Sequence, residues 1–291
     1  DELLQCIGRA SPTSGDELLP RVIGVTGPPG AGKSTLIGRL IAVARGTERR
    51  VAVLAVDPSS PFSGGALLGD RVRMNRHGGD AGVFIRSTST RGATGGLSPA
   101  ALEIVGVLEA AGYEDIIVES VGVGQSEVGI LGLADVVLVV MNPGVGDEIQ
   151  ALKAGVMEIG DIYVLNKADR PGAERTEREL HEVCDHAVRS TVPPIVVKTV
   201  STTGDGVHEL YDAIGVRMEA ISSAGELIER RRRRVGDAMV ETAATLFRDW
   251  IRRRGIADLR DGIPFAELRR RLEVVLKTIE SEYGGDDDSD D

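Results

Sequence analysis

Residues 27–34 read Gly-Pro-Pro-Gly-Ala-Gly-Lys-Ser, which fits the phosphate-binding pattern G-x-x-x-x-G-K-[ST]. The pattern lies between an apolar run at 22–25 and a helical pattern at 34–44, and its glycines allow a turn that aims backbone N–H groups at phosphates. Lys33 could reach the β- and γ-phosphates and the Ser34 hydroxyl a Mg²⁺ ion, so this loop predicts a nucleoside triphosphate site. The predicted nucleotide contacts of the loop are Gly27, Gly30, Ala31, Gly32, Lys33, Ser34 and Thr35.

A second motif indicates which base the nucleotide carries. The apolar run at 162–165 is followed by Asn-Lys-Ala-Asp, the N-K-x-D pattern of GTPases. The Asp169 carboxylate can accept hydrogen bonds from N1–H and from the exocyclic amino group of guanine, and adenine offers neither donor at that place. Lys167 would lie along the base plane, and Asn166 would connect this loop to the phosphate loop. The motif therefore predicts GTP and GDP as the ligands.

A third feature supports guanine. Ser201-Thr202-Thr203 follows an apolar run at 195–197, and this placement suits the loop whose backbone N–H meets the guanine O6. The alternatives for these patterns are a glycine-rich turn without a ligand and a strand end followed by ordinary polar residues. The order of the motifs, with the base loop after the phosphate loop and at the carboxyl end of a strand, favours the nucleotide site.

Acidic residues between the two motifs are candidates for chemistry. Glu119 ends an apolar run and heads Glu-Ser-Val-Gly, at the place of the D-x-x-G motif of regulatory GTPases. An acid there can hold Mg²⁺ through water, and the Gly122 N–H can sense the γ-phosphate. Asp57 ends the run at 51–56 and Asp70 lies in a glycine-rich stretch, and for both a capping or loop role is an open alternative. The candidate metal ligands are Ser34, Asp57, Asp70 and Glu119, and the three acids together with Lys33 are candidates for catalysis.

These residues need a scaffold, and short β-branched runs alternate with helical segments along the chain. That alternation is typical of a mainly parallel sheet with helices on both faces, and strands that are apolar throughout belong inside it. The predicted fold is therefore an α/β P-loop GTPase with about seven strands. Strands are predicted at 22–25, 51–56, 83–85, 116–119, 136–141, 162–165 and 195–200, and helices at 34–44, 99–111, 148–157, 174–188 and 207–222.

The composition changes near Glu226, where arginine becomes frequent and apolar residues recur at helical spacing. We expect the arginine run at 230–234 to form a solvated helix face rather than a phosphate-binding patch. A second helical stripe covers 268–279, and the acidic tail contains no apolar residue to bury, so we expect it to be disordered. The predicted divisions are an N-terminal segment at 1–20, a GTPase domain at 21–225, a helical region at 226–283 and the tail at 284–291.

Charge and composition narrow the class of protein. A net charge of −11 with a pI near 5.0 opposes a nucleic-acid partner, since binding phosphates along a strand requires a basic face. No apolar run reaches the roughly 18 residues of a membrane span, and nothing resembles a signal peptide, so we expect a cytoplasmic protein with no membrane partner. Cys6 and Cys184 are far apart and lack metal-ligand spacing, which predicts reduced thiols.

Taken together, the motifs resemble one family, the GTPases that accompany adenosylcobalamin-dependent methylmalonyl-CoA mutase. It is called MeaB or ArgK in bacteria and the methylmalonic aciduria type A protein in humans. The resemblance rests on the strings at 56–61, 64–74, 119–127 and 166–169 and covers most of the chain. It implies hydrolysis of GTP with Mg²⁺, a homodimer built with the helices of 226–283, and gating of cofactor loading or protection of such a mutase.

The resemblance also implies a further functional segment. The family carries an additional segment after the strand predicted at 136–141, and residues 143–153 match it. Asp147 and Lys153 are therefore candidates for coupling the nucleotide state to the partner, with Lys153 able to approach the phosphates. The alternative is a helix N-terminus capped by Asp147 and followed by an exposed lysine.

Two other functions stay open. A nickel-insertion GTPase of the urease or hydrogenase type shares the architecture but needs ligands rich in His and Cys, and this chain has four His and two Cys, scattered. A small-molecule kinase would transfer phosphate to an acceptor, whereas a GTPase releases phosphate with water alone.

Overall fold

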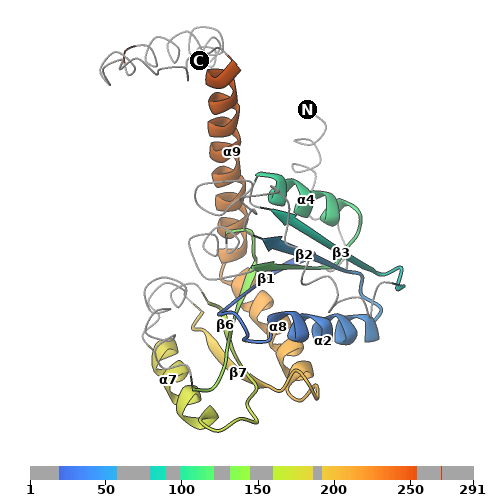
Figure 1. Ribbon diagram of the computed structural model, residues 1–291, viewed down its shortest axis with the longest axis vertical. Helices are drawn as coiled ribbons and strands as arrows, with labels where there is room; N and C mark the ends of the chain where they lie inside the picture. Colours follow the sequence, from blue (N-terminus) through green and yellow to red (C-terminus); the bar gives the residue numbers. More distant parts are fainter. Residues whose placement is uncertain are drawn as a thin grey trace. The chain divides into compact units, whose positions relative to one another are not determined.

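The computed structural model describes residues 20–57, 79–89, 99–120, 132–144, 160–185, 192–253 and 270. The described strands form a single parallel sheet (Figure 1). They are β1 (Arg21–Thr26), β2 (Val51–Asp57), β3 (Val83–Ser89), β4 (Asp115–Ser120), β5 (Val136–Met141), β6 (Ile162–Asn166) and β7 (Ile195–Thr199). The strand order is β3-β2-β4-β1-β5-β6-β7, and every pair is parallel. The predicted α/β class with seven strands is confirmed.

Strands inside the sheet match their predicted positions closely, and the differences lie at the edges. β1, β4, β5 and β6 are buried along their whole length, as their apolar runs predict. The sequence predicts β3 only over 83–85, but the strand continues through Arg86 to Ser89 and pairs with β2 as far as Asp57. β3 is an edge strand, so polar side chains are tolerated there and hydropathy does not reveal its end.

Helices cover both faces of the sheet. α2 (Lys33–Gly46) and α8 (Val207–Ser223) pack on one face. α4 (Pro99–Ala110) and α7 (Ala173–Asp185) pack on the other, and Figure 1 shows α4 across the strands from α2. Each predicted helix in the described part of the chain is present, with ends that differ by a few residues.

Alternation along the strands assigns side chains to the two faces. On β1, Ile23 and Val25 join the core beneath α2, and Val22 joins the core beneath α4. Burying this apolar surface from water is the main stabilising contribution to such a fold. Cys184 on α7 is buried in the same way against β5 and β6, and burial raises the pKa of its thiol to about 11.

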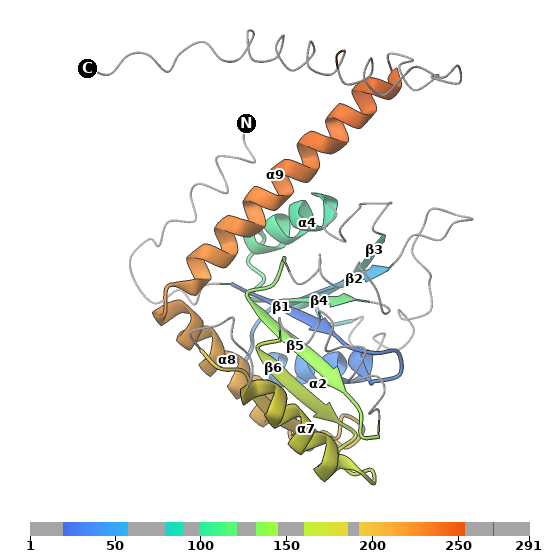
Figure 2. The same ribbon diagram turned by 90° about the vertical axis from the view of Figure 1, so that its left-hand side faces the viewer.

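The last described helix, α9 (Glu226–Arg253), begins directly after Gly225, whose φ of 77° allows the sharp turn from α8 seen in Figure 2. The chain divides into two compact units between Thr242 and Ala243, so the first part of α9 belongs to the unit that contains the sheet. None of the described helices is both long enough and apolar enough to cross a membrane.

The expectation that the arginines at 230–234 form a solvated face is wrong for most of the run. Arg230 pairs with Asp161 and Arg231 with Asp135 at 2.8 Å each, and these buried aspartates directly precede β6 and β5. Arg234 donates to the Leu133 carbonyl at 2.6 Å. Arg232 and Arg233 are exposed. Positions i, i+1 and i+4 share one face of a helix, and here that face lies against the amino ends of β5 and β6.

Some predictions fall outside the described residues. These are the helix at 148–157, the second helical stripe at 268–279, the acidic tail at 284–291 and nearly all of the segment 1–20. The candidate site residues outside the described part are Asp70, Gly122, Asp147 and Lys153.

Candidate nucleotide-binding site

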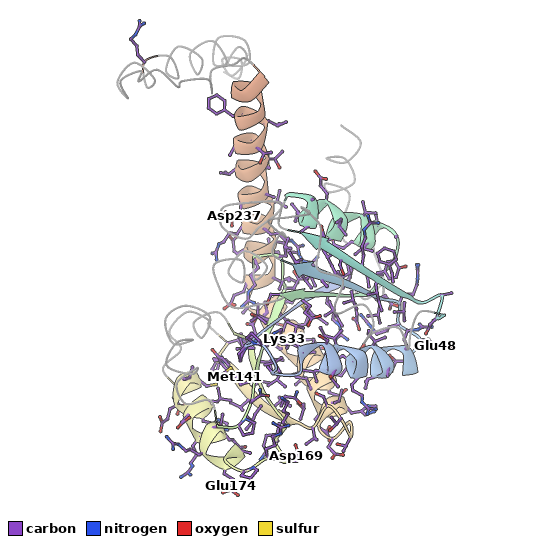
Figure 3. All side chains as sticks on the ribbon, in the orientation of Figure 1. Lys33, Glu48, Met141, Asp169, Glu174 and Asp237 are labelled. Atoms are coloured by element: carbon purple, nitrogen blue, oxygen red, sulfur yellow. The ribbon has the colours of Figure 1, made fainter. Side chains whose placement is uncertain are left out.

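The candidate residues gather at the carboxyl end of the sheet. β1 lies in the middle, between β4 and β5, and the chain runs to one side of it through β2 and to the other side through β5. In open α/β sheets the strand order reverses at such a point, and the loops there diverge to leave a crevice for a ligand. The loop at 27–32 leaves β1 at this point, and Figure 3 shows Lys33 at the start of α2 with Glu48 beyond its far end.

Two glycines of the phosphate loop occupy backbone conformations and spaces that other residues cannot share. Gly27 has φ 137°, and a Cβ there would lie 2.1 Å from the Val140 carbonyl oxygen of β5. Gly32 has φ 95° and caps α2 without a side-chain hydrogen bond. The first N–H groups of α2 therefore face the loop without a capping side chain, which is the arrangement that binds anions at helix N-termini.

Lys33 and Ser34 begin α2 and point toward different partners. Lys33 is 8% exposed, and its ammonium donates to the Gly27 carbonyl at 2.6 Å and to the Pro28 carbonyl at 3.2 Å. The Ser34 hydroxyl donates to the Glu119 carboxylate at 3.0 Å, and Glu119 is 1% exposed. Residues 117 and 119 of β4 share the face that packs on α2, which explains how a residue distant in sequence reaches Ser34.

The Ser34 and Glu119 oxygens fit a magnesium ion. Mg²⁺ prefers oxygen ligands and usually takes only one or two from the protein, with phosphates and water completing the shell. Among the described residues, no group of three His, Cys, Asp or Glu side chains is arranged to hold a metal. Asp57 ends β2, beside β4, so its backbone stands at the same edge of the sheet as Glu119.

Asn166 connects the base loop to the phosphate loop. Its amide donates to the Ala31 carbonyl at 2.8 Å, while its side-chain oxygen accepts from the Ser201 N–H at 3.1 Å and from the Ser201 hydroxyl at 2.7 Å. The same oxygen accepts from the Thr199 hydroxyl at 3.2 Å, and Asn166 is 1% exposed. One buried side chain thus holds the loops after β1, β6 and β7 together.

Lys167 and Asp169 follow on the same loop. Lys167 adopts φ 55°, and its ammonium donates to the Gly30 carbonyl at 2.6 Å. Burial, and to a lesser degree the nearby charge of Arg170, lowers the pKa of this ammonium. Asp169 is exposed, as are Thr202 and Thr35, so all three side chains are accessible to a ligand.

Two contacts at this edge were not predicted from the sequence. Arg39 of α2 donates to the Ser201 and Thr202 carbonyls, and Asn142 donates to the Gly30 carbonyl at 3.2 Å. Asn142 follows β5 directly, and a polar residue at the carboxyl end of a strand is a signal that could have identified it. Arg39 lies within a helix and gives no such signal.

The chain is similar in sequence to a family of GTPases and to several of its named members. Residues 3–254 match the family described as "Methylmalonyl Co-A mutase-associated GTPase MeaB", which confirms the predicted resemblance. A Pyrococcus horikoshii protein named as a GTPase is 51% identical over 218 residues, 74% of this chain and 69% of that protein. GTPase ArgK of Escherichia coli is 38% identical, covering 72% of this chain and 65% of its own length. The mitochondrial methylmalonic aciduria type A homolog of Mus musculus is 36% identical, covering 72% and 52%.

Solved structures share the fold. The crystal structure titled LAO/AO transport system kinase superposes with a TM-score of 0.63 at 24% identity and covers 94% of this chain and 92% of its own. HypB from Helicobacter pylori in complex with nickel gives a TM-score of 0.51 at 16% identity, covering 69% and 88%. At such identities the likeness concerns the fold and does not choose between kinase, nickel and GTPase chemistry.

Proposed function

The chain belongs to the methylmalonyl-CoA mutase-associated GTPase family, and from that premise we propose that it hydrolyses GTP to GDP and phosphate. We further propose that this cycle gates cofactor loading or protection of an adenosylcobalamin-dependent acyl-CoA mutase of the methylmalonyl-CoA type. The observation that carries the nucleotide proposal is the direct link between the two loops, in which Asn166 binds both Ala31 and Ser201. A link of this kind lets one nucleotide contact both loops at once.

At the phosphate end, Lys33 stabilises the charge that develops as the γ-phosphate leaves. Its ammonium already lies on the loop through the Gly27 carbonyl, so little reorganisation is needed to turn it to a phosphate oxygen. Ser34 and Glu119, with Asp57 and Asp70 as further acids, would hold Mg²⁺. When bound, the ion neutralises charge on the β- and γ-phosphates.

At the base end, Asp169 would accept hydrogen bonds from N1–H and from the amino group of guanine, and Lys167 would lie along the base. The Ser201 N–H is committed to Asn166, so the next backbone donor, the N–H of Thr202, is the group that would meet the guanine O6. In this assignment Ser201 holds the loop in place through Asn166, and Thr202 contacts the base.

A direct test of the reaction class uses γ-labelled GTP in water and then with candidate acceptors. Release of free phosphate at a rate that no acceptor raises supports the GTPase proposal. Transfer of the label to a small molecule would support a kinase instead. A nickel-insertion function would require nickel binding that responds to GTP, which equilibrium dialysis measures.

Coupling to the mutase is the finer part of the proposal. Gly122, Asp147 and Lys153 would respond to the γ-phosphate and pass its presence to the partner, since a ligand acts by preferring one of two states. GTP turnover should rise when the cognate mutase is added, and the rise should shrink in Lys153→Ala but not in the control Lys198→Ala, whose lysine pairs with Glu177 on the surface. No stimulation by any cobalamin mutase from the same source would refute the chaperone role.

We also propose a homodimer that uses α9. Ile228 and Met239 lie three turns apart on one face of this helix, and they are 58% and 61% exposed. Large apolar side chains repeated along one helix face suit a second copy of the same helix. Light scattering should give twice the chain mass, and Met239→Glu should shift the protein toward the monomer. A parental chain that is monomeric at high concentration would contradict this proposal.

A further inference from the structure

Arg39 joins the helix of the phosphate loop to the base loop. It lies in the second turn of α2, and its guanidinium Nε donates to the Ser201 carbonyl at 2.9 Å. A second nitrogen of the same group donates to the Thr202 carbonyl. The planar fork of an arginine presents its donors in fixed directions, so two successive carbonyls are held by one rigid group.

Holding the Ser201 carbonyl also fixes the Thr202 N–H, because the two belong to one peptide unit. In a planar trans peptide the C=O and the N–H point in opposite directions. The carbonyl is turned toward Arg39, so the N–H is turned away from that side chain. Arg39 therefore sets the direction of a backbone donor that it does not touch.

The Thr202 N–H differs from its neighbours in the same turn. The Ser201 N–H donates to Asn166, and the N–H groups of Thr203 and Gly204 donate to the Val200 carbonyl at 3.1 and 2.8 Å. Within the described part of the chain, the Thr202 N–H has no acceptor. A backbone donor left without a partner among fully bonded neighbours is available to a ligand.

We propose that Arg39 is a positioning residue for guanine selection, which aims the Thr202 N–H at the guanine O6. The inference rests on the proposed binding of guanine nucleotides. At the place of O6, adenine carries an amino group, which is a donor, so a fixed N–H there would face another donor. A mobile peptide could turn away from adenine, whereas the peptide held by Arg39 cannot. Selection against adenine then depends on the rigidity that Arg39 supplies.

The test compares nucleotide analogues on matched variants by isothermal titration calorimetry. The ligands are GDP, 6-thio-GDP, in which sulfur replaces O6, and IDP, which lacks the amino group. The variants are Arg39→Ala, Arg39→Lys and the control Arg45→Ala, whose arginine lies on the same helix but pairs with Asp80 at 2.8 Å. Thermal unfolding without nucleotide checks that each variant is folded.

Arg39→Ala should weaken the binding of GDP about fivefold to tenfold, which corresponds to the loss of one hydrogen bond. The preference for GDP over 6-thio-GDP should fall by a similar factor, and the preference for GDP over IDP should stay, because Asp169 reads the amino group. Arg39→Lys keeps the charge but loses the planar guanidinium, so its GDP affinity and its preference for GDP over 6-thio-GDP should lie between those of Arg39→Ala and of the parental chain. Arg45→Ala should match the parental chain in both. If Arg39→Ala does not fold, the affinity ratios of GDP to 6-thio-GDP and of GDP to IDP in Arg39→Lys test the inference instead.

The outcomes separate this inference from the proposed function. Equal weakening of GDP and 6-thio-GDP in the arginine variants would overturn the inference, since Arg39 would then only stiffen the loop. An unchanged affinity for both ligands would overturn it as well. If the parental chain binds neither guanine ligand, the proposed function itself is wrong, and the roles of both Arg39 and Asp169 are withdrawn with it.

Discussion

Polar side chains gather at both ends of the sheet, but they are bonded in different ways. At the amino end, carboxylates meet guanidinium groups. Asp161 is bound by Arg217 at 2.9 Å and by Arg230 at 2.8 Å, and it accepts the Val137 N–H at 2.9 Å. At the carboxyl end, the Lys33 and Lys167 ammonium groups donate to loop carbonyls.

The difference separates a structural use of charge from a functional use. A carboxylate that is enclosed by two guanidinium groups has its charge balanced and its acceptors occupied, so it fixes helices to the sheet. A carbonyl orients an ammonium group without neutralising it, so the charge can still attract phosphate. We therefore expect substitutions at the amino end to change stability, and substitutions at the carboxyl end to change nucleotide binding and hydrolysis.

The largest expected effect is at the carboxyl end. Lys33→Ala should slow GTP hydrolysis by on the order of 4 kcal/mol in activation free energy, roughly a thousandfold, because it removes a charge that the transition state needs. Phosphate release at saturating GTP measures this. Lys198→Ala removes an exposed lysine and serves as the control. Hydrolysis by Lys33→Ala at more than a tenth of the parental rate would break the comparison at this end.

The next effect is at the amino end. Asp161→Asn should lower the free energy of unfolding by about 3 kcal/mol, since it removes the counter-charge of the buried Arg217 and one of the two carboxylates that pair with the half-buried Arg230. Urea denaturation measures the loss. Turnover per folded molecule should stay at the parental value, because Asp161 precedes β6 at the end of the strand away from the nucleotide.

A matched control removes an ion pair that is exposed. Glu229→Gln breaks the pair between Glu229 and Arg232 at 3.1 Å, in which both side chains are largely exposed. Such pairs contribute about 0–1 kcal/mol, so the unfolding free energy should change little. If Glu229→Gln and Asp161→Asn lower the unfolding free energy by the same amount, burial does not explain why the ion pairs of Asp161 stabilise the fold.

The fold could be predicted from the sequence because its signals are local. Apolar runs locate β1, β5 and β6 to within a residue or two, since strands buried on both faces carry no polar positions. The end of β3 could not be predicted, because Arg86 to Ser89 are held by pairing with β2 and not by their own hydropathy.

The candidate site divides in the same way. The phosphate and base motifs are short strings, so Lys33, Asn166 and Asp169 could be named from the sequence. Arg39 could not, because its partner Ser201 is 162 positions away. The expectation of a solvated arginine face fails for the same reason, since Arg230 and Arg231 form ion pairs with aspartates that are 69 and 96 positions away. Contacts of this length leave no local pattern.

A smaller effect is expected at the base loop. Asp169→Asn should weaken the binding of GTP by about 1.4 kcal/mol, or tenfold in Kd, because a charge-assisted pair of hydrogen bonds with guanine is lost. Because Asp169 is exposed, the unfolding free energy should hardly change. Competition titrations with GTP and ATP measure the selectivity. If ATP competes as well as GTP on the parental chain, the assignment of guanine is wrong.

The smallest effect concerns pH at the amino end. Burial by itself raises the pKa of Asp115, but the hydrogen bond and charge of Arg21, with help from Tyr211 and Arg49, outweigh it and hold the pKa below its ordinary value of 3.8. As the pH falls, the unfolded chain therefore binds the proton first. The stability that ionised Asp115 contributes is present above its unfolded pKa and is lost as the pH falls through the folded pKa.

The parental chain should therefore keep its full advantage in unfolding free energy over Asp115→Asn down to about pH 4 and lose it progressively below. Urea denaturation of both chains at several pH values measures the gap between them. The gap should not widen with acid, because protonated Asp115 resembles the amide in charge. A gap that stays constant at the lowest pH where both chains fold would mean that packing, and not the carboxylate charge, supplies the stability. In that event the amino end would not be the charge-balanced counterpart of the nucleotide site.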